Sequence, residues 1–256
     1  MLTDPLFLAV AAIAVILLGL AKGGFAGVGT LSTPLLALVV APGDAAGILL
    51  PILLVSDAIS VWSYRKSWDA RNLKVMMPAA AVGIAAGWWL AAYFTPAYVR
   101  ISIGLIAIAF GLFNLVGLAG RRKVAKPSAV KGAFWASIAG FTSFVSHAGG
   151  PPFQIHLLPQ RLPHEVFVGT STIYFAWTNV LKVVPYGLLG QLSAKNITVS
   201  LAFLPLSVAA TFVGLWLIRR TPHERFYKIV YALMILVGVV LLREGWIGIF
   251  GAAGAH

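Results

Sequence analysis

The stretch GLAKGGFAGVGT, residues 19–30, interrupts the first hydrophobic segment of the chain and contains five glycines in twelve residues. Each glycine inside a helix costs about 1 kcal/mol relative to alanine, so a straight helix is not expected to continue through this stretch. A second break, SFVSHAGGPP at residues 143–152, interrupts another hydrophobic segment, and Gly140 follows Gly19 by 121 residues. Interrupted apolar segments at corresponding positions in two halves are typical of secondary transporters, whose binding site lies where the interruptions meet.

The composition is that of an integral membrane protein. Of the 256 residues, 60% are hydrophobic and 10% are charged, and the mean hydropathy is +0.92. The apolar runs are continuous rather than alternating, which predicts spanning helices and not a β-barrel. The chain has no cysteine, which excludes disulfides and thiolate chemistry. The first segment has no basic residue before Lys22, so we expect it to belong to the mature fold rather than to a signal peptide.

A second pair of matching motifs supports two repeats. GWWL at residues 87–90 corresponds to GLWL at residues 214–217, and a Thr-Pro pair follows each of them. We therefore predict repeat one at 1–120, a basic cytoplasmic linker at 121–132 and repeat two at 133–256. In repeat one the expected segments are a broken pair at 5–41 and spans near 45–64, 75–94 and 101–119. In repeat two they are a broken pair at 133–160 and spans near 167–187, 198–218 and 228–249.

The formal net charge of +12 is interpreted as membrane topology, because basic residues in short loops mark the cytoplasmic side. Residues 65–74 contain four basic side chains, whereas their counterpart at 187–196 contains one. The bias is reversed in the next loop, where residues 219–228 contain four and the counterpart at 95–100 contains one. Equivalent loops should therefore face opposite sides, which predicts inverted repeats. Nucleic acid is excluded as a partner because the basic residues form no aromatic-interleaved module.

Inversion requires an odd number of crossings in each repeat. Three full spans plus a re-entrant pair of half-helices meet this condition, as would five full crossings. The short segments 28–41 and 152–160 favour the re-entrant version. The predicted fold is thus an all-α polytopic membrane protein of two inverted repeats, each with a broken or re-entrant helical pair and three transmembrane helices. A parallel arrangement of four plus four spans stays open.

The two breaks supply most of the candidate binding residues. Unwound backbone inside a membrane must face protein or a wet cavity, and its N–H groups together with a helix start can bind an anion. Tight helix packing is the alternative for the glycines, and a core histidine bonded to a backbone carbonyl is the alternative for His147. The candidates in the breaks are Lys22, Gly23, Gly27, Gly29, Thr30, Ser146, His147, Gly149, Gly150 and Gln154.

The segment after the second break adds two candidates, Asn179 and Lys182, which share one helical face with Phe175 and Tyr186. Lys182 lies between apolar neighbours, and an ionisable group inside a membrane indicates a functional site unless it reaches the interface. Asp57 precedes Asn179 by 122 residues and is the only carboxylate within a predicted span. It could pair with Lys22 or Lys182, and together with His147 it could carry a coupled proton. Lys182→Ala is expected to weaken anion binding while leaving folding largely intact.

The paired glycine breaks, the SHAGGPP stretch at 146–152, and Gly169-Thr170 followed by Phe175, Asn179, Lys182, Tyr186, Gly190 and Gln191 resemble the sulfite exporter TauE/SafE family. The resemblance covers almost the whole chain, and its second-half motifs are the more specific. It departs from the family pattern at Lys22, which occupies the first break. The resemblance implies movement of sulfite, a sulfonate such as sulfoacetate, or another small organic anion across the cytoplasmic (inner) membrane of a prokaryote.

The residues agree with an anion as the small-molecule partner, since Lys22, Lys182, His147 and two helix ends all provide positive potential. Export by alternating access is the preferred mechanism. A passive anion channel and a proton-coupled carrier of another organic anion are the alternatives. A membrane-embedded enzyme and a cation carrier are disfavoured by the few ionisable residues. No cofactor or metal motif occurs, and neither the oligomeric state nor the coupling ion follows from the sequence.

Overall fold

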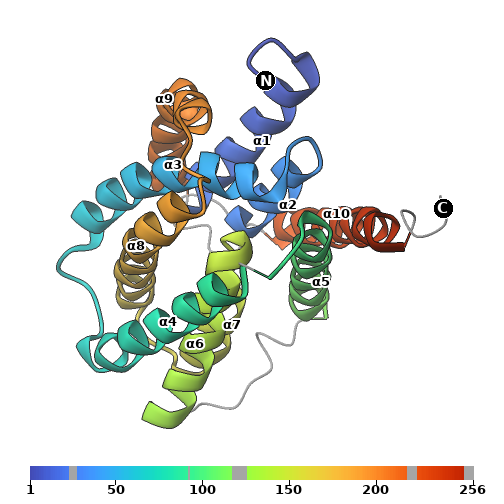
Figure 1. The fold of residues 1–256 in the computed structure, drawn as a ribbon. Helices are drawn as coiled ribbons and strands as arrows, with labels where there is room; N and C mark the ends of the chain where they lie inside the picture. The colour runs from blue at the N-terminus through green and yellow to red at the C-terminus, as the bar shows by residue number, and fades with distance from the viewer. Residues whose placement is uncertain (23–27, 92, 117–125, 218–223, 251–256) are drawn as a thin grey trace.

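The computed structural model describes residues 1–22, 28–91, 93–116, 126–217 and 224–250, and within these ranges it is helical, with no strand. The first half contains α1 (Pro5–Lys22), η1 (Val28–Leu31), α2 (Ser32–Ala37), α3 (Pro42–Tyr64), α4 (Ala70–Ala91) and α5 (Pro96–Leu115). The second half contains α6 (Ala129–Ser146), α7 (Gly150–Leu157), η2 (Leu158–Gln160), α8 (His164–Leu188), α9 (Ala194–Leu217) and α10 (Glu224–Phe250). Figure 1 shows the pair α5 and α10 set apart from the bundle that contains α3 and α8.

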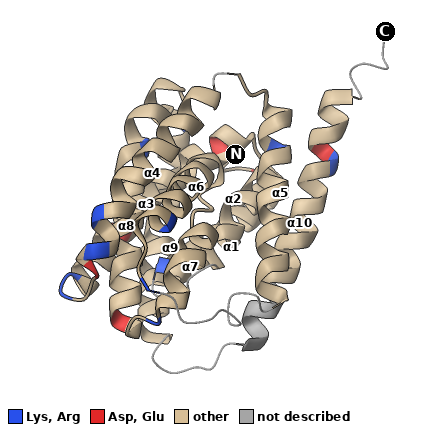
Figure 2. Cartoon of the chain, turned by 90° about the horizontal axis from the view of Figure 1, so that it is seen from below, with Lys and Arg blue, Asp and Glu red and all other residues tan. Residues whose placement is uncertain are grey.

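The outer surface is that of a protein embedded in a bilayer. In the described part of the chain, six helices are long and apolar enough to cross a membrane, namely α1, α3, α4, α5, α9 and Tyr231–Phe250 of α10. Large apolar side chains face outward, and Trp89 and Leu201 are 66% and 61% exposed. Charged residues are confined to a few places, as Figure 2 shows. The prediction of an all-helical integral membrane protein is confirmed.

Each predicted hydrophobic segment corresponds to helical structure. In both broken pairs an 18-residue helix is followed by a short one, α1 by η1 and α2, and α6 by α7. The predicted linker at 121–132 is too long, because α6 begins at Ala129. The hydroxyl of Ser128 accepts a hydrogen bond from the Lys131 N–H, so the helix starts immediately after this N-cap.

Helices α3 and α8 run antiparallel. The start of α3 lies against the turn that follows α8, because Gly47 packs on the backbone of Gln191. The start of α8 lies against the end of α3, because Gly169 packs on the backbone of Ser67. A side chain at either glycine would collide with backbone, so both positions require glycine. Gly169 follows Gly47 by 122 residues, the offset that relates Asn179 to Asp57.

The main contacts of the long helices correspond when the two halves are exchanged, whereas the short helix α2 packs on α3, α5 and α10 and its counterpart α7 packs chiefly on α6. Helix α4 packs chiefly on α6 and its counterpart α9 on α1, while α5 packs on α10 and α3 on α8. The glycines repeat this pattern, since Gly19 of α1 packs on Ser207 of α9 and Gly140 of α6 packs on Ala80 of α4. The glycines that are equivalent in sequence therefore make equivalent helix contacts.

Candidate functional site

The second break ends α6 by a change in backbone conformation at His147. This residue has a φ of 53°, in the left-handed region, which few residues other than glycine adopt. Its N–H donates to the Ser143 carbonyl, and the Ala148 N–H donates to the Thr142 carbonyl. Helix α7 then begins at Gly150 with the two prolines in its first turn, as predicted.

The first break follows the end of α1 at Lys22. Two of the predicted binding residues, Gly23 and Gly27, lie outside the described residues. Gly29 packs against α1, since a Cβ there would lie 2.8 Å from the Cβ of Ala21. Tight helix packing, the alternative to anion binding for these glycines, is therefore present at Gly29. Gly29 also borders a cavity.

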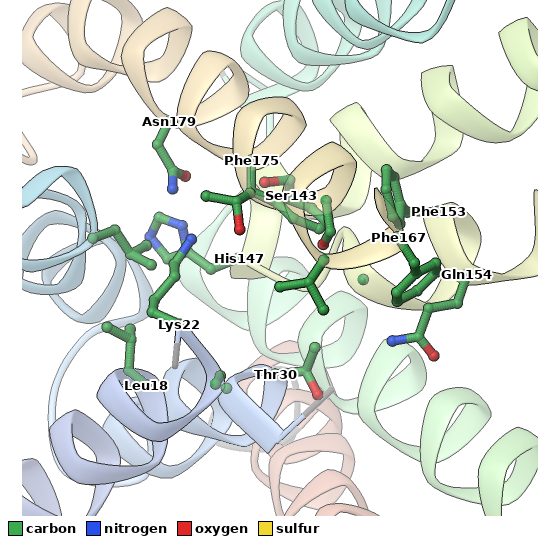
Figure 3. Close-up of a pocket in the computed structure, with 17 residues that line it drawn as sticks. Leu18, Lys22, Thr30, Ser143, His147, Phe153, Gln154, Phe167, Phe175 and Asn179 are labelled. Carbon is green, nitrogen blue, oxygen red and sulfur yellow. The ribbon is translucent and has the colours of Figure 1, made fainter. Parts of the chain in front are cut away.

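This first cavity has a volume of about 110 Å³ and lies where both breaks meet α8. It is lined by Leu18, Ala21, Lys22, Gly29, Thr30, Leu53, Ser143, His147, Gly150, Phe153, Gln154, Phe167, Val168, Ser171, Thr172, Phe175 and Asn179. Figure 3 shows Lys22, His147 and Asn179 toward one end and Phe153, Phe167 and Gln154 toward the other. The cavity thus has a cationic polar end and an end with aromatic walls.

Lys22 provides the cationic group at the polar end. Its ammonium pairs with Asp57 Oδ1 and lies 5.7 Å from the centroid of the Phe175 ring. Asn179 donates to the other carboxylate oxygen, Asp57 Oδ2, at 2.6 Å. Asp57 is buried behind the cavity wall, and its hydrogen bonds fix both Lys22 and Asn179. An ammonium has three N–H donors, and Asp57 is the one acceptor of the Lys22 ammonium found among the described residues, which leaves donors for an anion in the cavity.

Lys182 is fully buried and does not line the cavity. Its Nζ donates to the carbonyl and hydroxyl oxygens of Ser143, both at 3.1 Å, and to His147 Nδ1 at 2.7 Å. These three acceptors match the three donors of the ammonium. The positive group also lies at the carboxyl end of α6, where carbonyls lack helical partners and the helix dipole favours a cation. Snorkelling to the interface is therefore wrong for Lys182.

His147 both borders the cavity and is bonded to a backbone carbonyl, the contact given from the sequence as the alternative for a core histidine. Its ring borders the cavity, and Nε2 lies 3.1 Å from the Ala46 carbonyl oxygen. Since Lys182 donates to Nδ1, the proton is assigned to Nε2, which donates to Ala46. The imidazole thereby connects Lys182 on α8 to the start of α3.

Some of the remaining predicted residues line the cavity, and others pack outside its lining. Thr30, Gly150 and Gln154 line the cavity. Ser146 does not, and its hydroxyl donates to the Thr142 carbonyl at 3.2 Å. Gly149 also lies outside the lining and packs against α6 and α8.

Gly149→Ala should destabilise the fold, whereas Gly150→Ala should not. A Cβ at position 149 would lie 2.7 Å from the Ala139 carbonyl oxygen and 3.0 Å from both Phe175 Cε1 and Ser143 Cβ. At position 150 the nearest atom would be 3.7 Å away. Overpacking of this kind costs about 1–3 kcal/mol. Thermal unfolding of the detergent-solubilised variants checks this, and equal midpoints for the two variants would contradict it.

The aromatic end of the cavity was not predicted from the sequence, apart from Phe175. Phe167, Ser171 and Phe175 lie on one face of α8 at successive intervals of four residues, and Thr172 lies seven residues before Asn179. Extending the face of Phe175 and Asn179 toward the start of α8 would have found them. No periodicity identifies Phe153, which reaches the cavity from the short helix α7.

No metal site is present in the described part of the chain, where no three His, Asp or Glu side chains are grouped closely enough to hold an ion. The family model described as Sulfite exporter TauE/SafE matches residues 11–241. No curated protein and no solved structure matches the chain.

Proposed function

The chain belongs to the sulfite exporter TauE/SafE family, and we propose that it carries sulfite or an organosulfonate such as sulfoacetate out of the cell by alternating access. The observation that supports this most directly is the Lys22 ammonium, which borders the cavity and is fixed by Asp57. Family membership makes the chain a membrane transporter of the exporter class. The substrate and the mechanism are the proposal.

In this proposal the sulfur oxyanion binds at the polar end of the cavity. Its oxygens accept hydrogen bonds from Lys22, and charge-assisted bonds of this kind are the stronger ones. Asn179 and His147 border the same end, although Asp57 and Ala46 already accept one hydrogen bond from each. The organic part of a sulfonate would lie against Phe153, Phe167 and Phe175. The predicted residues Gly29, Thr30, Gly150 and Gln154 would shape the cavity around it.

We further propose that the two halves are inverted repeats that rock against each other. Two observations support this. The equivalent helices α3 and α8 pack antiparallel, with Asp57 bonded to its counterpart Asn179. The main contacts of the long helices also correspond when the halves are exchanged, since α4 packs on α6 as α9 packs on α1. A two-fold axis in the membrane plane would produce both, and it places the site at the junction of the repeats.

The proposed location is the cytoplasmic (inner) membrane of a prokaryote, with the basic residues of 65–74 on the inside. One negative charge that moves outward gains about 2.3 kcal/mol per 100 mV of inside-negative potential. Export therefore needs no coupled ion. Proton coupling is the alternative, and a dependence of flux on a pH gradient would favour it.

The test is flux into proteoliposomes of labelled sulfite and sulfoacetate, with carboxylates of matched size as competitors, at fixed membrane potentials. We expect saturable, potential-driven flux with counterflow that prefers the sulfur anions. Non-saturating flux without counterflow would indicate a channel. Equal competition by the carboxylates, or no flux of either sulfur anion, would overturn the proposed substrate class. Protein-free liposomes are the control.

A further inference from the structure

A second cavity, of about 350 Å³, lies beyond the end of α8, whereas the first cavity lies against the earlier part of that helix. The second cavity is bordered by Gly43 and Asp44 at the start of α3, by Ala91 at the end of α4, and by Gln191 after α8. The first cavity takes its α8 residues from Phe167 to Asn179. Nine residues of helix separate Asn179 from the end of α8 at Leu188, which corresponds to about 14 Å along the axis, and Gln191 lies just beyond that end. The two cavities therefore lie at different depths.

The polar groups that border the second cavity indicate that it contains water. Among the residues that the structure describes, the Gln191 side-chain oxygen is buried without a hydrogen-bond partner, and Gln191 borders the cavity. A buried acceptor of this kind is normally satisfied by water. Asp44 also borders the cavity and accepts a hydrogen bond from Asn196 at 2.8 Å. Both groups favour water over lipid in this space.

The wall between the cavities is the last turn of α6. Ser143 and His147 border the first cavity, whereas Phe144 and Val145 border the second. Besides the bonds that Lys182 donates to Ser143 and His147, two hydrogen bonds hold this turn against α3 and α8, and we call these two the gate contacts. His147 Nε2 donates to the Ala46 carbonyl at 3.1 Å, and the Tyr186 hydroxyl donates to the Phe144 carbonyl at 2.6 Å.

We infer that the second cavity is the other half of the anion path and that the gate contacts close it from the first. The inference rests on the proposed transport of a small anion, because only a transported solute requires a path on both sides. An anion bound at Lys22 would leave when the end of α6 separates from α3 and α8. Rupture of the gate contacts is then the step that connects the two cavities.

Single cysteines test this sharply, because the chain contains none of its own. Ser171→Cys reports the first cavity and Val145→Cys the second. Val184→Cys is the matched control, because Val184 lies on α8 and is 65% exposed on the outer surface of the protein. Each variant is treated with a membrane-impermeant methanethiosulfonate in right-side-out and in inside-out vesicles, without substrate.

We expect Ser171→Cys to react from the face of residues 65–74, Val145→Cys to react from the opposite face, and Val184→Cys to react from neither. Adding Tyr186→Phe removes one gate contact and should raise the labelling rate of Val145→Cys from the face of residues 65–74 about two- to tenfold, the equivalent of one hydrogen bond. An unreactive Val145→Cys, equal labelling of both reporters from one face while Tyr186 is present, or a rate unchanged by Tyr186→Phe would overturn the inference. Labelling needs no anion, so these results are independent of the flux assay.

Discussion

Lys22→Met is expected to weaken anion transport about ten- to hundredfold at low substrate concentration, which corresponds to loss of one charge-assisted hydrogen bond of about 1.5–3 kcal/mol. The side chain of Lys22 borders the first cavity, and its ammonium donates one hydrogen bond to Asp57 Oδ1. The reduction should appear mainly as a higher KM, because the lost interaction is with the bound anion. Initial flux in proteoliposomes measured over a range of sulfite concentrations checks this.

A stability effect must be separated from the effect on binding. Without Lys22 the buried Asp57 carboxylate keeps the hydrogen bond from Asn179 but has no cationic partner. Removing one member of a buried ion pair is strongly destabilising, by about 3–5 kcal/mol for a fully buried pair and less for the partly exposed Lys22. The double variant Lys22→Met/Asp57→Asn removes both charges and should recover the unfolding midpoint without recovering transport. Transport at the level of the parent protein in this double variant would remove Lys22 from the anion site.

The two breaks and their partners could be predicted because their signals are local. A run of glycines and a Pro-Pro pair end helices wherever they occur, so the positions of α1, α6 and α7 followed from short stretches. The constant offset between Asp57 and Asn179 was also visible, although it gave no sign that the two side chains bond to each other. The pairing of Asp57 with Lys22 was one of two possibilities, and only the packing of α1 on α3 decides between them.

The function of Lys182 could not be predicted, because its partners lie on another helix. Charge and an apolar neighbourhood indicated a binding residue, yet all three donors are used by Ser143 and His147. The corresponding residue of the first half makes a similar contact with an uncharged side chain. Ser60 precedes Lys182 by 122 residues, and its hydroxyl donates to the Lys22 carbonyl at the end of α1. Both residues thus cap the broken helix of their own half.

The halves therefore differ in where the cation lies. In the first half the lysine is on the broken helix and serine is the capping residue. In the second half Ser143 is on the broken helix and lysine is the capping residue. Only the first arrangement directs an ammonium into the cavity. Lys22 and Lys182 are consequently expected to respond differently to substitution.

Lys182→Ala is expected to destabilise the protein by about 3–5 kcal/mol, because it removes a fully buried side chain and leaves acceptors on Ser143 and His147 without a donor. This reverses the expectation from the sequence, in which folding stayed largely intact. Lys182→Met retains most of the volume, so its cost should be limited to about 1–3 kcal/mol for the unsatisfied acceptors. Thermal unfolding in detergent should therefore rank the parent protein first, the methionine variant second and the alanine variant last.

The KM for sulfite then shows whether Lys182 contacts the anion or only holds neighbouring residues in place. In Lys182→Met the Lys22 and Asp57 pair is untouched, so the KM for sulfite should stay within about threefold of the parent value while the maximal rate falls with the displacement of His147. Lys22→Met provides the opposite pattern in the same assay. A Lys182→Ala protein that unfolds at the parent temperature and binds the anion more weakly would mean that Lys182 contacts the substrate, as its sequence environment alone had indicated.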